Sequence, residues 1–381
     1  MPTGTTRYYR EAAQDPRHRA RAVRNQTLPH CETALLSTDH DPRLAQVHAW
    51  LRTLPASLGL APDTLRPASS DASFRRYFRL DAGTGTAIVM DAPPPHEDVG
   101  PFLHVGSLLL ETGLNVPRVL AQDPAQGLLL LSDLGRDTYY HRIQAGLDDA
   151  ALQALYRDAL AALVRMQQAR TDGLPTYDRP RLAAELELFP EWYVARHHGA
   201  QLDDKAAAAL QHIFGLLSDA NAAQRAVLVH RDFHSPNLMV CDDPAYGPNP
   251  GVLDFQDALA GPITYDLASL VTDARTTWEE PQQLDWAVRY WEMARAAGLP
   301  VDSDFAVFHQ AYEWMSLQRN LRILGVFARL HHRDGKPAYL AHMPRVNGYV
   351  RQVAQRYGVF TPLLRLLDKL DNREARVGYT F

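Results

Sequence analysis

The first third of the chain alternates apolar and polar positions, whereas most of the remainder repeats apolar residues at the spacing of helices. Short alternating or apolar runs predict four strands, at residues 72–80, 86–90, 116–120 and 128–131. A helix is expected between the second and third strands, with Asp98 at its start and Gly113 just past its end. This segment is therefore predicted to form a small strand-rich lobe with one helix.

Leucine- and alanine-rich patterns of helical periodicity begin at residue 148 and continue almost to the end of the chain. The predicted helices cover residues 148–170, 203–223, 283–297, 304–332 and 343–370, and strands are expected at 226–231 and 250–255. One more helix is expected at 44–54, ahead of the first strand. We predict an α+β protein with an N-terminal extension (1–42), a small lobe built on an antiparallel sheet (43–134) and a large, mainly helical lobe (135–381).

The composition is that of an ordinary globular protein and excludes several classes of partner. Of the 381 residues, 46% are hydrophobic and 22% charged, and 39 Lys and Arg against 44 Asp and Glu give a net charge of −5. This balance supplies no field for binding nucleic acid or a membrane surface, and no apolar run approaches the roughly 18 residues of a membrane span. Cys31 and Cys241 are too few for a disulfide framework. We expect a cytoplasmic protein, favoured as a monomer, that acts on a small molecule.

The densest chemical signal lies between Val227 and Val240, where an apolar strand is followed by His-Arg-Asp, ending at Asp232, and then by Asn237. A second apolar strand ends at Asp254. Phosphoryl transfer from ATP requires hard oxygen ligands for Mg²⁺ and a group that orients the acceptor hydroxyl and takes its proton. We therefore expect Asn237 and Asp254 to hold Mg²⁺, and Asp232 to be the catalytic base.

Each of these residues is a weak signal alone, because a single Asp after a strand is more often a turn or cap residue. Their order and spacing are specific, since they match the catalytic and metal-binding loops of kinases. Gln256 stands where the metal-binding loop of kinases usually has glycine. His230 and Phe255 are expected to orient and support the two loops.

The segments Leu253–Ala258 and Gly261–Ala268 resemble the second signature of the aminoglycoside phosphotransferase and choline kinase superfamily. The resemblance covers about residues 45–375 and implies a bilobal protein-kinase-like fold with ATP and Mg²⁺ as cofactors. The small lobe would then bind the nucleotide, and the large lobe would carry the catalytic loop and the acceptor site. The resemblance also implies a structural role for Asp266, which would tie the catalytic loop to the helix that follows.

Three further segments, 69–79, 88–94 and 317–330, are similar to the anomeric sugar kinases of bacterial peptidoglycan recycling. This finer resemblance implies phosphorylation of N-acetylmuramate and N-acetylglucosamine at the C1 hydroxyl. A different small acceptor stays open, whether an aminoglycoside, a choline-like alcohol or another sugar. So does a pseudokinase that only binds nucleotide.

The nucleotide site departs from the usual kinase pattern in its phosphate loop, because residues 69–73 contain no glycine. We expect Ser70 and Ser73 to contact phosphate through hydroxyl and backbone N–H groups, although an ordinary turn explains the same residues. Adenine is expected at the hinge between the lobes, against the backbone of Ser132, Asp133 and Leu134.

A second departure is Met90, which stands where kinases usually have the lysine that binds the α and β phosphates. Three arginines of the preceding strand are candidates to replace that lysine: Arg75, chosen first, then Arg76 and Arg79. The acidic partner of the lysine has two candidates, Glu97 and Glu111. Solvent-facing positions on a strand explain the arginines almost as well.

The acceptor site is predicted from the helix at 304–332, where Arg319, Arg322 and Arg329 fall within roughly 80° of one another at 100° per residue. Guanidinium groups suit the carboxylate of N-acetylmuramate and would repel a cationic acceptor. Arg319 is the arginine expected to contact the substrate. Three aromatic residues are candidates for stacking on a sugar ring, or else for core packing: Trp192, Trp314 and Tyr265.

Overall fold

The computed structural model describes residues 41–70 and 74–372. Chain contacts divide the protein into two units, Met1–Ala45 and Gln46–Phe381, and the features below belong to the second unit. The predicted first helix is confirmed as α1 (Pro42–Thr53), which crosses the boundary between the units. Ser73 and most of the predicted extension lie outside the described residues.

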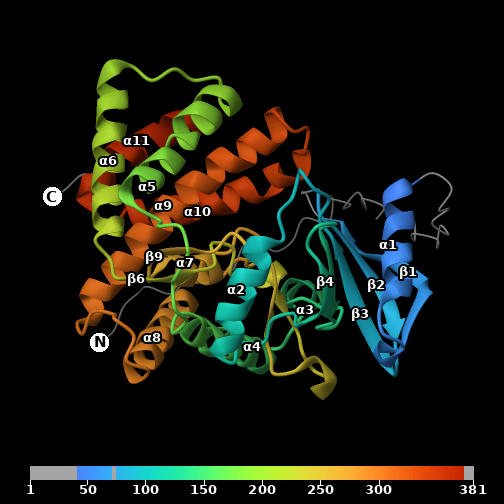
Figure 1. Cartoon of the computed structure of the whole chain (residues 1–381). Coiled ribbons are helices and arrows are strands. Elements are labelled where there is room, and N and C mark those ends of the chain that lie inside the picture. The colour runs from blue at the N-terminus through green and yellow to red at the C-terminus, as the bar shows by residue number, and fades with distance from the viewer. Residues whose placement is uncertain (1–40, 71–73, 373–381) are drawn as a thin grey trace, which may run out of the picture. The chain divides into compact units, whose positions relative to one another are not determined.

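Five antiparallel strands form one sheet with the order β1-β2-β3-β5-β4 (Figure 1). The strands are β1 (Leu60–Ser70), β2 (Arg76–Ala82), β3 (Gly85–Asp91), β4 (Val119–Asp123) and β5 (Leu128–Ser132). Helix α2 (Gly100–Glu111) lies between β3 and β4 in the chain, as predicted. The hairpin of β2 and β3 is in continuous register from Arg76 opposite Asp91 to Ala82 opposite Gly85.

The predicted strands of this sheet are correct in kind and wrong at some of their ends. The first was predicted from residue 72, but β2 begins at Arg76. The third begins at Val119 rather than at 116, because Pro117 has no N–H to give to a sheet. The strand β1 was not predicted: it contains two prolines, and its pairing with β2 is interrupted by two register shifts.

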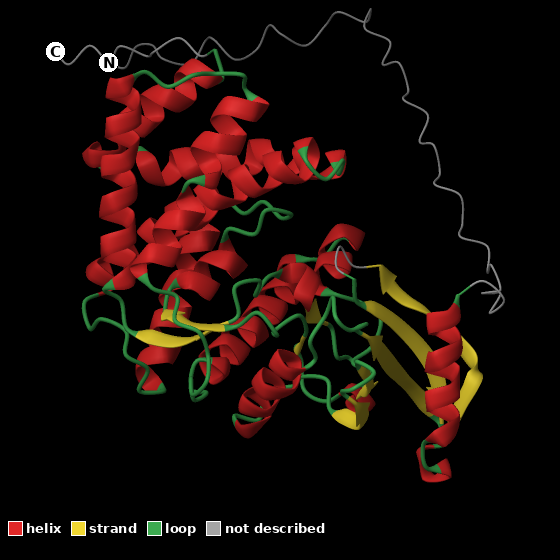
Figure 2. Cartoon of the chain, turned by 45° about the horizontal axis from the view of Figure 1, so that its top comes forward, coloured by secondary structure: helices red, strands yellow, loops and turns green. Residues whose placement is uncertain are grey.

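Helices make up most of the chain after Ser132, and Figure 2 shows most of them packed together apart from the five-stranded sheet, with short strands among them. The longer ones are α3 (Tyr139–Ala145), α4 (Asp149–Met166), α5 (Arg179–Leu186), the π-helix η3 (Phe189–His197), α6 (Asp204–Ala222), α7 (Tyr265–Val271), α8 (Glu280–Ala296), α9 (Phe305–His332), α10 (Met343–Ala354) and α11 (Thr361–Leu370). Short 3₁₀ turns are η2 (Ala56–Leu58), η4 (Ser235–Asn237), η5 (Pro244–Tyr246), η6 (Pro337–His342) and η7 (Gly358–Phe360). The helix predicted at 343–370 is two helices, because the chain turns at Gly358 and Pro362 can start a helix but not continue one.

Two short strand pairs carry the segments that the motif analysis singled out. β6 (Ala226–Val229) pairs with β9 (Leu259–Pro262), and β7 (Leu238–Met239) pairs with β8 (Gly251–Val252). Both predicted strands here are shorter than expected. Asp232 lies in the loop after β6, beyond the strand as predicted, whereas Asp254 lies in the loop after β8 rather than within the predicted strand. The positive φ of Arg231 (77°) and Asp254 (64°) marks where each loop turns.

The core of the second unit consists of two clusters of buried apolar side chains. One joins β3 and β5 of the sheet to helices α2, α4 and α8, and includes Met90, Phe102, Leu131 and Trp286. The other lies among η3, α6, α9, α10 and α11, and includes Phe189 and Leu324. Among the described residues, no helix has the length and apolar character that crossing a bilayer requires.

Candidate active site

The catalytic loop after β6 is held in place by a buried carboxylate at the start of α7. Asp266 Oδ2 accepts a hydrogen bond from the backbone N–H of His230 (2.7 Å), and Oδ1 accepts one from Arg231 (3.0 Å). Burial raises the pKa of Asp266 to about 6, against the opposing effect of His230 and of the two N–H groups. Asp266 therefore ties the catalytic loop to α7, as the family resemblance implied.

His230 and Phe255 have the structural roles predicted for them. The backbone N–H of Asp232 donates to Nδ1 of His230 (3.3 Å), and Nε2 of His230 lies 2.8 Å from the carbonyl oxygen of Leu253. The imidazole thus links the catalytic loop to the loop that carries Asp254. Phe255 is fully buried and packs against Phe102 of α2, with ring centroids 4.8 Å apart.

The side chains of Asn237 and Asp254 come together between the two loops. Nδ2 of Asn237 donates to the carbonyl oxygen of Asp232 (2.9 Å) and to Oδ2 of Asp254 (3.3 Å). The backbone N–H of Leu253 donates to the carbonyl oxygen of Asn237 (2.9 Å), which fixes the spacing of the two segments. The amide oxygen of Asn237 accepts no hydrogen bond from any described residue.

These two residues fit a magnesium ion whose other ligands come from phosphate and water. A carboxylate and an amide oxygen are hard oxygen donors, and Mg²⁺ is usually bound in proteins by one or two carboxylates plus phosphate groups. Within residues 41–70 and 74–372, no cluster of three or more His, Cys, Asp or Glu side chains could hold a metal by itself. The donor set therefore suits a metal that arrives with a nucleotide.

Asp232 is ionised at neutral pH. Burial opposes its ionisation, yet electrostatic interactions with His234, Arg322, Arg319 and His230, in that order, lower its pKa to about 2. His234 lies near both Asp232 and Asp273, and burial lowers its pKa to about 4. Asp273 in turn accepts hydrogen bonds from the backbone N–H (3.1 Å) and the hydroxyl of Ser235.

A cavity of about 350 Å³ lies between the sheet and the two loops. Its lining includes Ser132, Asp133 and Leu134 of the hinge, together with Asn237 and Asp254. Apolar side chains from the sheet and from the helical part of the chain complete the walls: Ile88, Leu131, Phe102 and Met239. The predicted hinge residues and the predicted metal ligands therefore face the same cavity.

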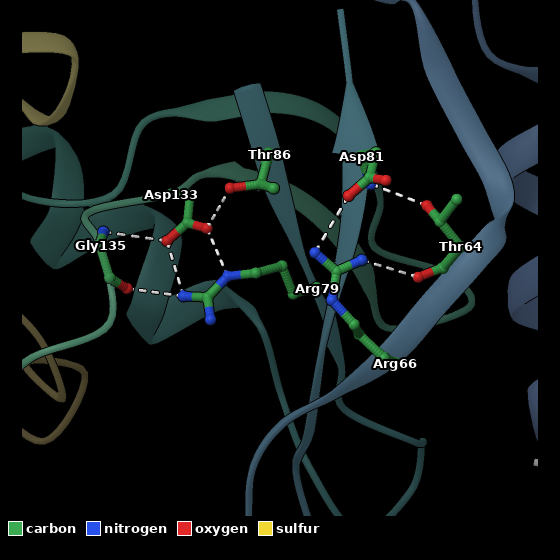
Figure 3. A network of polar contacts seen from close by, with 7 residues as sticks. All are labelled: Thr64, Arg66, Arg79, Asp81, Thr86, Asp133 and Gly135. Atoms are coloured by element: carbon green, nitrogen blue, oxygen red, sulfur yellow. Dashed lines mark hydrogen bonds and ion pairs between the residues drawn. The ribbon is translucent and has the colours of Figure 1, made fainter. Parts of the chain in front are cut away.

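The hinge is fixed by a network around Asp133, shown in Figure 3. Arg79 binds its carboxylate with two hydrogen bonds (Nε to Oδ2, 2.5 Å; Nη2 to Oδ1, 2.9 Å). The hydroxyl of Thr86 and the N–H of Gly135 donate to the same carboxylate. Burial raises the pKa of Asp133, but these donors together lower it below its usual value. The Asp133 side chain is thus engaged within the protein, which leaves only its backbone for a nucleotide.

The hydrogen bonding of Ser132 corrects one expectation for the hinge. Its backbone N–H donates to the carbonyl oxygen of Arg118 (2.9 Å), and its hydroxyl accepts from the N–H of Arg118 (2.8 Å). The backbone N–H of Ser132 is used in pairing β5 with Arg118, directly before β4. This N–H is therefore not available to adenine.

Of the arginines considered as replacements for the missing lysine, two are committed elsewhere. Arg79 is held by Asp133, and Arg76 pairs with the fully buried carboxylate of Asp91 (2.7 Å). Met90 is buried in the core. This leaves Arg75, whose charge interacts with those of Asp254 and Asp257 in the metal-binding loop.

Arg75 pairs with Glu97 (Nε to Oε2, 3.0 Å), and the two side chains are only 14% and 15% exposed. Burial lowers the pKa of Arg75, but the charges around it, including those of Glu97, Asp254 and Asp257, raise it above its usual value. Glu111, the alternative acidic partner, lies on the surface and pairs with Arg170 (3.0 Å). An Arg–Glu pair therefore lies close to Asp254. Ser70 ends β1, and its side chain is not described.

One carboxylate near the catalytic loop joins two arginines. It was not identified from the sequence. Glu185 of α5 accepts from Nη2 of Arg231 (2.8 Å), pairs with Nε of Arg322 (3.2 Å) and accepts from the hydroxyl of Tyr177. Nothing in the sequence around Glu185 or Tyr177 forms a motif, so only the packing of α5 against α9 reveals them.

The remaining predicted acceptor residues divide into two groups. Tyr265 is buried beside this cluster, with its ring 5.3 Å from that of Tyr177, and Arg319 is buried on α9. Trp314 instead packs edge-on against Tyr357 and Phe360, and Trp192 belongs to the same core cluster. The contacts of both tryptophans are those of core packing, the alternative that the sequence left open.

Comparison with known proteins places this geometry in a family. The model of the phosphotransferase enzyme family matches residues 64–302. An N-acetylmuramate/N-acetylglucosamine kinase of Pseudomonas aeruginosa is 45% identical to the chain over 338 residues, which cover 87% of this chain and 97% of that protein. The protein of the same name from Neisseria meningitidis is 45% identical over 317 residues, 82% of this chain and 93% of that protein.

Solved structures agree with this assignment at the level of fold. The ADP-bound aminoglycoside phosphotransferase APH(2'')-Ib superposes with a TM-score of 0.55 at 14% identity, covering 82% of this chain and 99% of that one. A choline/ethanolamine kinase family protein from Mesorhizobium loti gives 0.53 at 13% identity, covering 86% and 99%. The predicted α+β, bilobal, kinase-like fold is confirmed, and the chain belongs to the phosphotransferase enzyme family.

Proposed function

We propose that the protein is an ATP-dependent sugar kinase that phosphorylates N-acetylmuramate and N-acetylglucosamine at the C1 hydroxyl. The observation that carries the proposal is the 44–45% identity to two Pseudomonas kinases of that name over 97–98% of their length. Asp232, Asn237 and Asp254 supply the side chains that phosphoryl transfer needs. Residues 43–134 form the nucleotide-binding lobe in this proposal, and residues 135–381 carry the catalytic loop and the acceptor site.

ATP occupies the cavity beneath the sheet in this proposal. Adenine lies between apolar side chains such as Ile88 and Met239, against the backbone of Asp133 and Leu134. The phosphates extend toward Asn237 and Asp254, which hold Mg²⁺ through their side-chain oxygens. The bound metal neutralises negative charge on the β and γ phosphates. Arg75, fixed by Glu97, provides the positive charge that kinases usually obtain from lysine.

Asp232 acts on the acceptor. Its carboxylate accepts a hydrogen bond from the C1 hydroxyl and so orients the hydroxyl oxygen toward the γ-phosphorus. The new bond forms between that oxygen and the γ-phosphorus as the bond to the β,γ-bridging oxygen breaks, and the hydroxyl proton passes to Asp232. A carboxylate with a pKa of about 2 is a weak base, so the proton moves late, when the hydroxyl oxygen has become acidic. ADP is the leaving group.

Phosphorus NMR of the products tests this function directly. The protein is incubated with ATP, Mg²⁺ and N-acetylmuramate, and in parallel with N-acetylglucosamine. We expect a sugar 1-phosphate signal, coupled to the anomeric proton, and one ADP for each sugar phosphate. A phosphate at another position, or ADP release only with an aminoglycoside or an amino alcohol, would replace the proposed acceptor. Absence of any acceptor-dependent ADP release would support a pseudokinase instead.

A further inference from the structure

We propose that Arg319 recognises the carboxylate of an acidic acceptor sugar and thereby sets the preference between the two acceptors. The inference rests on the proposed function, because N-acetylmuramate differs from N-acetylglucosamine by a lactyl ether that ends in a carboxylate. Its starting point is one buried guanidinium on α9 for which the described residues supply no partner.

Arg319 is 3% exposed, and its Nε and Nη1 atoms are buried without any hydrogen-bond partner. A buried charge in a folded protein is normally paired, because removing it from water is otherwise strongly unfavourable. Neither an ion pair nor a hydrogen bond of this guanidinium is found among the described residues. An anion that binds from outside the chain supplies the missing partner.

The position of Arg319 places that anion at the acceptor. Its positive charge contributes to the low pKa of Asp232 and acts on His234 and Asp266, so it lies close to the catalytic loop. Arg319 does not line the cavity in which the nucleotide is proposed to bind. The guanidinium therefore lies near the catalytic loop but outside the lining of the proposed nucleotide cavity.

The other arginines nearby are excluded by their partners. Arg231 and Arg322 share the carboxylate of Glu185, at 2.8 and 3.2 Å. Arg329 lies ten residues beyond Arg319, roughly 15 Å along α9 at 1.5 Å per residue, and its charge acts on Asp334 near the end of that helix. Arg231 and Arg329 also have a buried Nε atom without a partner, but Arg231 is paired with Glu185 and Arg329 acts on Asp334. Among the described arginines that act on Asp232, Arg319 is the one without an ion pair.

The partners already held by the carboxylates of the site support an anionic acceptor. Glu185 is one carboxylate for two guanidinium groups, and Asp266 is occupied by two backbone N–H groups. Asp232 faces the reacting hydroxyl in the proposed mechanism. One carboxylate on the substrate would therefore pair with the third guanidinium, in the bidentate geometry that arginine favours.

The test compares kcat/KM for the two sugars in Arg319→Met, Arg319→Lys and the wild type, with ATP saturating. We expect the ratio of N-acetylmuramate to N-acetylglucosamine to fall roughly 10- to 150-fold in Arg319→Met, the range for a lost hydrogen bond to a charged group. Arg319→Lys keeps the charge but loses the paired N–H donors of the guanidinium. Its ratio should lie between those of the wild type and Arg319→Met. Arg329→Met is the matched control on the same helix and should keep the wild-type ratio.

Three outcomes separate the possibilities. An unchanged ratio in a folded Arg319→Met protein, checked by thermal unfolding, overturns the inference and leaves the proposed function intact. An equal loss with both sugars also overturns it, because a contact to the transferred phosphoryl group would act on both. If the wild type phosphorylates neither sugar, the proposed function fails. Calorimetric titration of N-acetylmuramate into the wild type and Arg319→Met then tests the inference separately, and equal or absent binding in both proteins overturns it.

Discussion

The charged and polar side chains around Asp232 determine its pKa and therefore its strength as a base. Electrostatic interactions with nearby arginine and histidine side chains lower its pKa to about 2, so it is fully ionised at neutral pH but binds protons weakly. In the proposed mechanism its main contribution is therefore orientation of the acceptor hydroxyl, with proton transfer late in the reaction. Asparagine has nearly the same shape as aspartate but no charge, so Asp232→Asn tests the role of the charge separately from folding.

Replacing Asp232 by Asn should lower kcat by about 10² to 10⁴, the range expected for loss of a general base. The dissociation constant of ATP should change little, because Asp232 does not line the nucleotide cavity. Steady-state ADP release gives kcat, and calorimetry gives ATP affinity. Turnover within a few-fold of the wild type would remove Asp232 from the mechanism.

Asp266 provides a test of the catalytic loop through pH. Its pKa is raised from about 3.9 in an unfolded chain to about 6 in the folded protein, so the folded state binds its proton more tightly. The contribution of Asp266 to stability is therefore largest below pH 4 and declines as the pH rises through 6, by about 3 kcal/mol at most.

An Asp266→Asn variant should lack this dependence. Urea unfolding at pH 4.5 and 7.5 gives the free energy of unfolding for both proteins, and the difference between wild type and variant should shift in favour of the wild type at the lower pH. The same difference at both pH values would show that the pKa of Asp266 is ordinary.

At the scale of elements, the pair of Arg75 and Glu97 connects the start of β2 to the segment before α2. Kinases usually place a lysine on the strand that here carries Met90, which is buried. In the proposed mechanism, Arg75, directly before the neighbouring strand β2, supplies the positive charge instead. The pair is largely buried, so it is held more firmly than a surface ion pair.

Arg75→Met should raise KM for ATP roughly tenfold or more, because a charged hydrogen bond to phosphate is lost. KM for the sugar should be much less affected. The control is Arg66→Met on β1, which breaks the exposed pair of Arg66 and Asp81 in Figure 3 and should leave KM for ATP unchanged. Equal effects of the two substitutions would mean that Arg75 only stabilises the sheet.

The sequence predicted the parts of the site that lie close together along the chain. Asp232, Asn237 and Asp254 belong to two loops separated by a short strand pair, and their order and spacing are enough to identify them. Glu185 could not be found this way, because it reaches Arg231 and Arg322 across separations of 46 and 137 residues that only tertiary packing brings together. The unpaired state of Arg319 is invisible in a sequence for the same reason.

The same distinction holds for the elements. Helices with clear periodicity, such as α4, α6 and α9, were predicted nearly to their ends. The strand β1 was missed because its prolines and irregular register remove the alternation on which strand prediction depends. Its partner β2 supplies the pairing that its own sequence does not specify.

At the scale of the whole second unit, α9 sets the distance between the residues of the proposed acceptor site. It carries Arg319 and Arg322, and it packs against η3, which follows closely on the helix that bears Glu185. The contact is unusually close at Gly325, where a Cβ atom would lie 2.4 Å from the backbone carbon and oxygen of Leu188. The backbone cannot yield there without separating α9 from η3.

Gly325→Ala should therefore destabilise the protein by about 1–3 kcal/mol, although alanine is the better helix former by roughly 1 kcal/mol. The matched control is Gly348→Ala in α10, where an added Cβ would meet nothing within 4 Å and the substitution should stabilise by about 0.5–1 kcal/mol. Denaturant unfolding measures both.

Because a shift of α9 moves Arg322 away from Glu185, Gly325→Ala should also raise KM for the sugar more than KM for ATP. Stabilisation by both substitutions would mean that α9 and η3 are free to adjust, and that their close approach does not determine the geometry of the acceptor site.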